Sequence, residues 1–196
     1  MMQEISLILI VFSSLITLKV TPEVIIRSTK FGFVGKDVNK ESKILVPELG
    51  GLAGCFAILI TLSVFVGIYK LYDSYSEEYF IVLFFALLLS LVVGFVDDIS
   101  ILSRRTKALI MVMPAIPITI SQPGTPVINI LDIFILDFSK NALFYWIFLV
   151  PLGVTGVSNA LNMSAGYNGL ETGQVAIISF FLLIISIIAE VDSIVI

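Results

Sequence analysis

YFIVLFFALLLSLVVGFVDD, residues 79–98, contains no charged residue before its final two aspartates. A helix of about 20 apolar residues crosses the hydrocarbon layer of a bilayer. The apolar residues run on almost without interruption and do not alternate with polar ones, which favours a helix over a strand of a membrane barrel. The segment therefore predicts a transmembrane helix that ends at a pair of carboxylates.

The rest of the chain has the same character. Of its 196 residues, 58% are hydrophobic and 13% are charged, and the mean hydropathy is +1.10, which excludes a protein surrounded by water. Residues 1–196 are expected to form one transmembrane domain, an all-α polytopic bundle of about six helices. The expected spans are residues 5–26, 50–69, 79–96, 108–120, 142–157 and 174–189.

The fourth span and the connection that follows it each contain a pattern that predicts local structure. The fourth span is short and contains Pro114 and Pro117, which predict either a kink or an extension of the helix into the uncharged Ser-Gln that follows. After it, TPVINILDIFILDFSK, residues 125–140, alternates branched or aromatic residues with polar ones behind a Pro-Gly pair. This pattern predicts a short β-hairpin at the membrane surface between the fourth and fifth spans. The first span is expected to be a retained helix, because no basic segment precedes it.

The basic residues predict the orientation in a cell membrane. Eight of them follow the first and third spans: Arg27, Lys30, Lys36, Lys40, Lys43, Arg104, Arg105 and Lys107. The loops on the other side hold only Lys70 and Lys140. Because cytoplasmic loops are enriched in Lys and Arg, we expect an extracytoplasmic N-terminus and a cytoplasmic position for the polar segments.

The ionisable residues limit the chemistry. There is no histidine, and the single cysteine, Cys55, lies in the second span, where it is expected to be an apolar filler. Carboxylates, amides and lysines must therefore carry any reaction. In GFVDDISILSRRTK, residues 94–107, Asp97 and Asp98 end one helix and Lys107 opens the next. Adjacent carboxylates repel each other, so Mg²⁺ or a lysine is expected beside them; the alternative is a pair that merely caps the span in water.

A second polar segment is SNALNMSAGYNGLETGQ, residues 158–174. Asn159 and Asn162 share a helix face, and amides ligate Mg²⁺ or read a nucleobase edge. Gly166 would let a backbone approach a ligand closely. The alternative is a turn between two spans. A third segment, FGFVGKDVNKESKILVPELGG, residues 31–51, is a polar loop that could border a nucleotide or simply be solvated.

The three segments occur in one order: GKDVNK and PELGG, then GFVDDI with a lysine ten residues after its first aspartate, then NALNMSAGYNGLETGQ. Together they resemble the polyprenyl-phosphate N-acetylhexosamine-1-phosphate transferases, glycosyltransferase family 4, over residues 31–174. The pattern NG-L-E-x-GQ points to the branch that uses UDP-N-acetylglucosamine and dolichyl phosphate.

The resemblance implies transfer of N-acetylglucosamine 1-phosphate from UDP-N-acetylglucosamine to a polyprenyl (dolichyl) phosphate in protein N-glycosylation, with release of UMP. It implies Mg²⁺ as cofactor, a lipid bilayer and no nucleic acid as partner, and a cytoplasmic site. The matching residues comprise Asn162 as metal ligand, Lys107 on the pyrophosphate, Asp97 and Asp98 beside the metal and lipid phosphate, Asn168 on uridine, and Glu48, Asn159 and Gly166 as substrate contacts.

Two departures from the family pattern suggest alternatives. Ile101 stands where the family often has an asparagine, and the family has about ten spans, the later ones supplying a second metal-binding aspartate and a sugar-holding loop. We therefore expect an N-terminal portion that pairs with a second half or forms a homo-oligomer. A non-catalytic relative that binds UDP-sugar or lipid phosphate is the main alternative. A transporter or an aspartyl protease ranks lower, because such proteases carry their aspartates on different helices.

Overall fold

The computed structural model describes residues 2–36, 45–72, 77–100, 102–130, 133–164 and 169–188. The chain divides into two compact units. The first consists of Met1–Ser74 with Ala160–Ile196, and the second consists of Tyr75–Asn159.

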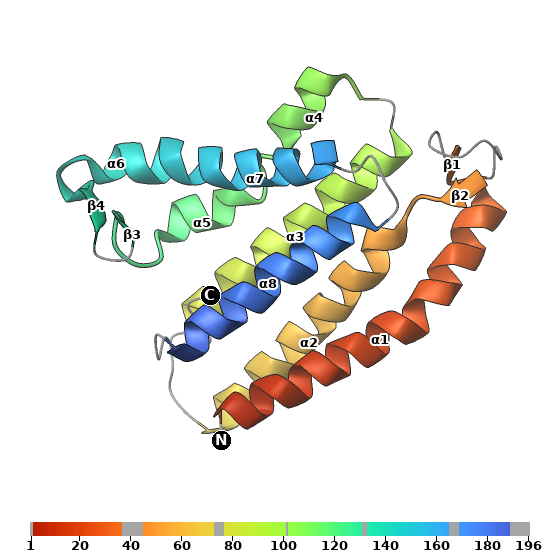
Figure 1. Cartoon of the computed structure of the whole chain (residues 1–196), viewed down its shortest axis with the longest axis horizontal. Coiled ribbons are helices and arrows are strands. Elements are labelled where there is room, and N and C mark those ends of the chain that lie inside the picture. The colour runs from red at the N-terminus through yellow and green to blue at the C-terminus, as the bar shows by residue number, and fades with distance from the viewer. Residues whose placement is uncertain are drawn as a thin grey trace. The chain divides into compact units, whose positions relative to one another are not determined.

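The first unit is built on two long helices that pack along each other, α1 (Met2–Phe31) and α2 (Gly50–Tyr72) (Figure 1). Ala53 and Ala57 on α2 are buried, and such small side chains let two helices approach closely in a membrane. The unit also contains α8 (Leu170–Ile188).

A hairpin joins α1 to α2 where the sequence predicted only a polar loop. α1 ends at Phe31, and the next residue, Gly32, has a φ of +80° that suits glycine. There, the Gly32 N–H donates to the Thr29 carbonyl at 3.3 Å and the Phe33 N–H to the Ser28 carbonyl at 2.9 Å. This turn starts β1 (Val34–Lys36), which pairs antiparallel with β2 (Leu45–Pro47).

The second unit begins with α3 (Glu77–Ile99), which packs against the short helix α5. The elements that follow α3 are α4 (Arg104–Ile110), α5 (Ala115–Ser121), β3 (Val127–Ile130), β4 (Phe134–Asp137), η1 (Ser139–Asn141), α6 (Ala142–Phe144), η2 (Tyr145–Leu149) and α7 (Val150–Ser164). β3 and β4 form the predicted hairpin. η2 is a π-helical segment directly before α7. Pro151, the second residue of α7, has no backbone N–H and so cannot donate a helical hydrogen bond to η2.

The fourth expected span, residues 108–120, is not one helix. It is divided between α4 and α5, which are seven residues each. Pro114 is the N-cap residue of α5 and cannot donate a backbone hydrogen bond to the preceding turn. Ala115, next to it, is fully buried in the second unit. The prolines therefore break the helix instead of kinking it.

The helices confirm a polytopic membrane protein. Within the described residues, four helical segments are long and apolar enough to cross a bilayer: Leu7–Phe31, Gly50–Ile68, Tyr79–Ile99 and Ser139–Ser164. A shorter apolar helix covers Leu170–Ile185, where the sixth span was expected. Most of their large apolar side chains point outward, as they do in lipid-facing helices.

Candidate functional site

An ion pair connects the end of α3 to α4 in the second unit. Nζ of Lys107 lies 2.6 Å from Oδ1 of Asp97, and the Asp97 side chain is only 12% exposed. Oδ1 is itself buried and receives no hydrogen bond of regular geometry, so the contact with the ammonium is an ion pair. The lysine that the sequence led us to expect beside the two carboxylates is therefore present.

The local sequence explains how Lys107 reaches the aspartate. The Ser103 hydroxyl accepts a hydrogen bond from the Thr106 N–H at 3.2 Å and caps the first turn of α4. The Lys107 N–H donates to the Ser103 carbonyl at 2.9 Å. Capping of this kind fixes where a helix begins. The Lys107 stem is thereby held one turn into α4.

The pair offsets an unfavourable charge at the end of α3. Carboxylates near a helix C-terminus face the negative end of the helix dipole, which costs about 0.3–1 kcal/mol at an exposed site. Asp97 and Asp98 both lie in that last turn, and the turn contains no basic residue. Lys107 supplies the missing positive charge beside Asp97, while Asp98 is exposed.

The predicted amides lie on α7. In the second unit, half-buried Asn159 donates from Nδ2 to the Thr155 carbonyl at 2.9 Å, so its amide nitrogen is occupied within the helix. Asn162 is exposed in the last turn of α7, and this residue belongs to the first unit. The two amides are three residues apart on one continuous helix, which confirms the predicted shared helix face.

Gly166 and Asn168 lie outside the described residues, but the ends of their segment are held together. The Ser164 hydroxyl lies 2.7 Å from the Gln174 amide oxygen and 2.7 Å from the Leu161 carbonyl. Gly169 has a φ of +83° immediately before α8, a conformation that favours glycine. The motif residues on both sides of 165–168 therefore have defined structural roles in the first unit.

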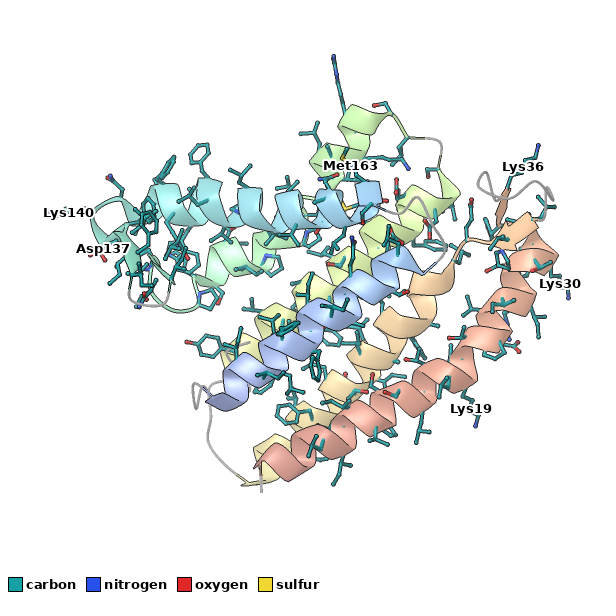
Figure 2. The ribbon with its side chains drawn as sticks, in the orientation of Figure 1. Lys19, Lys30, Lys36, Asp137, Lys140 and Met163 are labelled. Carbon is teal, nitrogen blue, oxygen red and sulfur yellow. The ribbon has the colours of Figure 1, made fainter. Side chains whose placement is uncertain are left out.

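Glu48 follows β2, and its carboxylate packs against Gly35 of β1. A Cβ at Gly35 would collide with Oε1 of Glu48, so the glycine leaves the space that this carboxylate occupies. The Glu48 N–H also donates to the Phe33 carbonyl at 3.2 Å. Lys30 and Lys36 extend outward at the same end of the first unit (Figure 2). Glu48 is thus an exposed acidic group held against the hairpin.

The described structure brings Asp97 and Lys107 together in one unit and places Glu48 and Asn162 in the other. Sequence reasoning missed Gly35, Ser164 and Gln174 as positioning residues. Ser164 and Gln174 stand inside the NALNMSAGYNGLETGQ motif, which was the available signal for them. No local pattern indicates the contact of Gly35 with Glu48, because it depends on strand pairing.

Comparison with known proteins places these residues in a family. The sequence profile described as glycosyl transferase family 4 matches residues 79–196, more than half of the chain. The chain belongs to this family. The matched region of this family 4 chain starts within α3 and includes Asp97, Lys107 and Asn162.

Several relatives match most of this family 4 chain. One from Saccharolobus solfataricus, provisionally named UDP-N-acetylglucosamine–dolichyl-phosphate N-acetylglucosaminephosphotransferase, is 31% identical over 84% of this chain and 49% of its own length. A Dictyostelium discoideum protein with that name is 26% identical over 90% of this chain and 47% of its own length. A phospho-N-acetylmuramoyl-pentapeptide-transferase from Caldicellulosiruptor bescii is 29% identical over 94% of this chain and 59% of its own length. The chain spans about half the length of the curated relatives it matches.

Proposed function

We propose that this chain supplies the nucleotide- and metal-facing half of a membrane transferase. The transferase moves N-acetylglucosamine 1-phosphate from UDP-N-acetylglucosamine to a polyprenyl (dolichyl) phosphate and releases UMP. The observation that carries the proposal is the Asp97–Lys107 ion pair at the end of α3, within the region that the family profile matches. The names of the Saccharolobus and Dictyostelium relatives support the choice of sugar and lipid.

The reaction needs positioned charge more than covalent help. An oxygen of the lipid phosphate attacks the phosphorus that bears the sugar, and the bond from that phosphorus to the bridging oxygen breaks. UMP leaves with the electron pair of that bond. Fixed positive groups around the transferred phosphoryl group supply most of the rate in such reactions. Lys107 is held by Ser103 and Asp97, and we assign its ammonium group to the pyrophosphate.

The donor set of this chain fits Mg²⁺. Magnesium in proteins is usually held by one or two carboxylates together with substrate phosphates. The described residues contain no cluster of three or more Asp, Glu, Cys or His side chains, so the fit rests on such a sparse set. The family resemblance assigns Asn162 to the ion and implies that Asp97 and Asp98 lie close to it. Bound Mg²⁺ would neutralise charge on the pyrophosphate.

The site is proposed to face the cytoplasm of a cell-membrane protein, at an early step of protein N-glycosylation. Cysteine labelling tests this orientation. In a Cys55→Ser background, exposed Ser103→Cys should react with an impermeant maleimide only after the cytoplasmic face is opened. Exposed Lys140→Cys should react from outside intact cells. The opposite pattern would reverse the orientation and contradict the proposal.

Binding of UDP-N-acetylglucosamine to the purified chain in detergent tests the site itself. We expect Mg²⁺-dependent binding that Lys107→Met abolishes and Lys140→Met leaves intact. Lys107 lies in α4, whereas Lys140 lies in η1 next to β4, and Figure 1 shows β4 far from α4 within the second unit. Equal binding by both variants would contradict the assignment of Lys107. Binding without UMP release, even with a second half supplied, would favour a non-catalytic relative.

A further inference from the structure

The β3–β4 hairpin has one apolar face and one mixed face. Residues directly opposite each other in an antiparallel pair lie on the same face. The register pairs Ile128 with Leu136 and Ile130 with Phe134, so these four side chains share a face, called here the apolar face. The opposite face carries the pairs Val127 with Asp137 and Asn129 with Ile135. The hairpin is therefore amphipathic.

The apolar face is open to its surroundings. Ile130 is 52% exposed, Phe134 51% and Leu136 39%, and Ile133 in the connecting turn is 86% exposed. A two-stranded hairpin on its own is marginally stable in water, and contiguous exposed apolar side chains mark an interaction surface. The hairpin thus needs an apolar environment on one side.

The base of the hairpin is fixed to the start of a membrane span. The Phe138 N–H donates to the Pro126 carbonyl at 2.9 Å, and Oδ1 of Asp137 accepts hydrogen bonds from the Ser139 N–H at 2.8 Å and its hydroxyl at 2.5 Å. These bonds lower the pKa of the Asp137 carboxyl, which is ionised at neutral pH even without them. Ser139 is the first residue of the candidate span Ser139–Ser164.

Aromatic side chains surround this junction. The Phe138 ring lies 5.7 Å from that of Tyr145 and 6.4 Å from that of Phe144, and the Tyr145 and Trp146 rings are 4.9 Å apart. Tyr and Trp are enriched where a span meets the headgroup layer, and here Tyr145 is half-buried while Trp146 is buried within the protein. Asp137 and Lys140 extend at the same tip of the second unit (Figure 2). The junction combines aromatic, apolar and charged groups as the membrane–water boundary requires.

We infer that the apolar face of the β3–β4 hairpin inserts into the boundary between lipid headgroups and acyl chains, while Asn129 and Asp137 stay on the aqueous side. The continuity of the hairpin with the span Ser139–Ser164 places it at that depth. A deep position is excluded because the outer strand edges carry backbone groups that need water or headgroups as partners. The inserted hairpin anchors the start of this span.

Tryptophan fluorescence in reconstituted vesicles tests the insertion. Trp146 is the only tryptophan in the chain, so a Trp146→Phe background leaves no competing signal. Phe134→Trp then reports on the apolar face, and Ile135→Trp, one residue away on the other face, is the matched control. The vesicles are phosphatidylcholine with bromine placed either near the headgroup or deep in the acyl chain.

We expect the Phe134→Trp signal to be quenched more by the shallow bromine than by the deep one, because interfacial elements bury their apolar face about 5–10 Å into this boundary. The Ile135→Trp signal should be quenched mainly by aqueous iodide. Iodide quenching of Phe134→Trp would show a water-exposed face, and protection from both quenchers would show a protein partner such as a second copy; either result overturns the inference. Ile130→Trp, opposite Phe134, repeats the measurement if Phe134→Trp does not elute as a monodisperse protein.

Discussion

Nζ of Lys107 and Oδ1 of Asp97 lie 2.6 Å apart, although their residues belong to different helices, α4 and α3. The pair links the end of α3 to the first turn of α4 and places a cation beside the Asp97 carboxylate. It therefore serves the fold of the second unit and the proposed chemistry at once, and the two roles are separable by experiment.

The first prediction concerns stability. Lys107→Met leaves the largely buried Asp97 carboxylate without its cation. We expect the free energy of unfolding to fall by about 1–2 kcal/mol, which lies between the contributions of exposed and buried ion pairs. The thermal midpoint should fall by about 2–8 °C. Circular dichroism in detergent measures it. The double variant Asp97→Asn with Lys107→Met should lose less than the sum of the single losses; simple additivity would show that the two groups do not interact.

A second prediction concerns Glu48. In Gly35→Ala the added methyl group takes the space of the Glu48 carboxylate, whose flexible side chain moves away without unfolding the hairpin. If Glu48 borders the nucleotide, the Kd for UDP-N-acetylglucosamine should rise about three- to tenfold, or about 0.6–1.4 kcal/mol, at an unchanged thermal midpoint.

The control for that measurement is Gly54→Ala in α2, where a Cβ meets no atom within 4 Å. It should leave binding unchanged and stabilise the helix by about 0.5–1 kcal/mol. Unchanged binding by Gly35→Ala, together with weaker binding by Glu48→Ala, would show that the glycine does not position the carboxylate.

The third prediction tests the contact between Ser164 and Gln174. Ser164→Ala removes the hydroxyl that lies 2.7 Å from the Gln174 amide oxygen. Because these residues flank the segment with Gly166 and Asn168, we expect KM for the UDP-sugar, measured with the second half of the Saccharolobus relative supplied, to rise more than kcat falls. Ser158→Ala is the control, since the Ser158 hydroxyl donates only within its own helix, to Val154. Rescue of KM by Ser164→Thr is also expected, and equal kinetics of the two alanine variants would refute the role.

A fourth prediction tests the metal assignment. Asn162→Ala should weaken Mg²⁺-dependent UDP-sugar binding far more than Asn141→Ala, since Asn141 lies in η1 at the other end of the span Ser139–Ser164. Both side chains are exposed, so neither variant leaves a buried cavity. A Mg²⁺ titration monitored by calorimetry measures the difference. Equal losses would remove Asn162 from the ligand set.

Much of this architecture could be predicted from the sequence. The continuous apolar run before Asp97 predicted α3 and its carboxylate end, and the repulsion of adjacent carboxylates predicted a cationic partner, which is Lys107. The Pro-Gly pair and the alternating residues after it predicted β3 and β4. These predictions were correct because each depends on a local sequence pattern or on charges within a few helical turns of each other.

Other features could not be predicted because they depend on contacts distant in sequence. The strands β1 and β2 have three residues each, too few to show an alternating pattern, and the contact of Gly35 with Glu48 follows from their pairing. Pro114 indicated a kink, but whether a helix bends or breaks depends on tertiary packing, here the burial of Ala115. The assembly of Asn162 and Glu48 with Asp97 stays a prediction that rests on the family resemblance.

The most direct measurement is Mg²⁺-dependent release of UMP from UDP-N-acetylglucosamine in the presence of a polyprenyl phosphate, by this chain alone and with the second half of the Saccharolobus relative supplied in trans. We expect the chain alone to turn over about a thousandfold more slowly, or slower still, than the chain with the second half. Each 1.4 kcal/mol of lost transition-state stabilisation costs about a factor of ten in rate. With the second half, turnover should appear and Asp98→Asn should abolish it. Robust turnover by the chain alone, or recovered turnover that survives Asp98→Asn, would contradict the account.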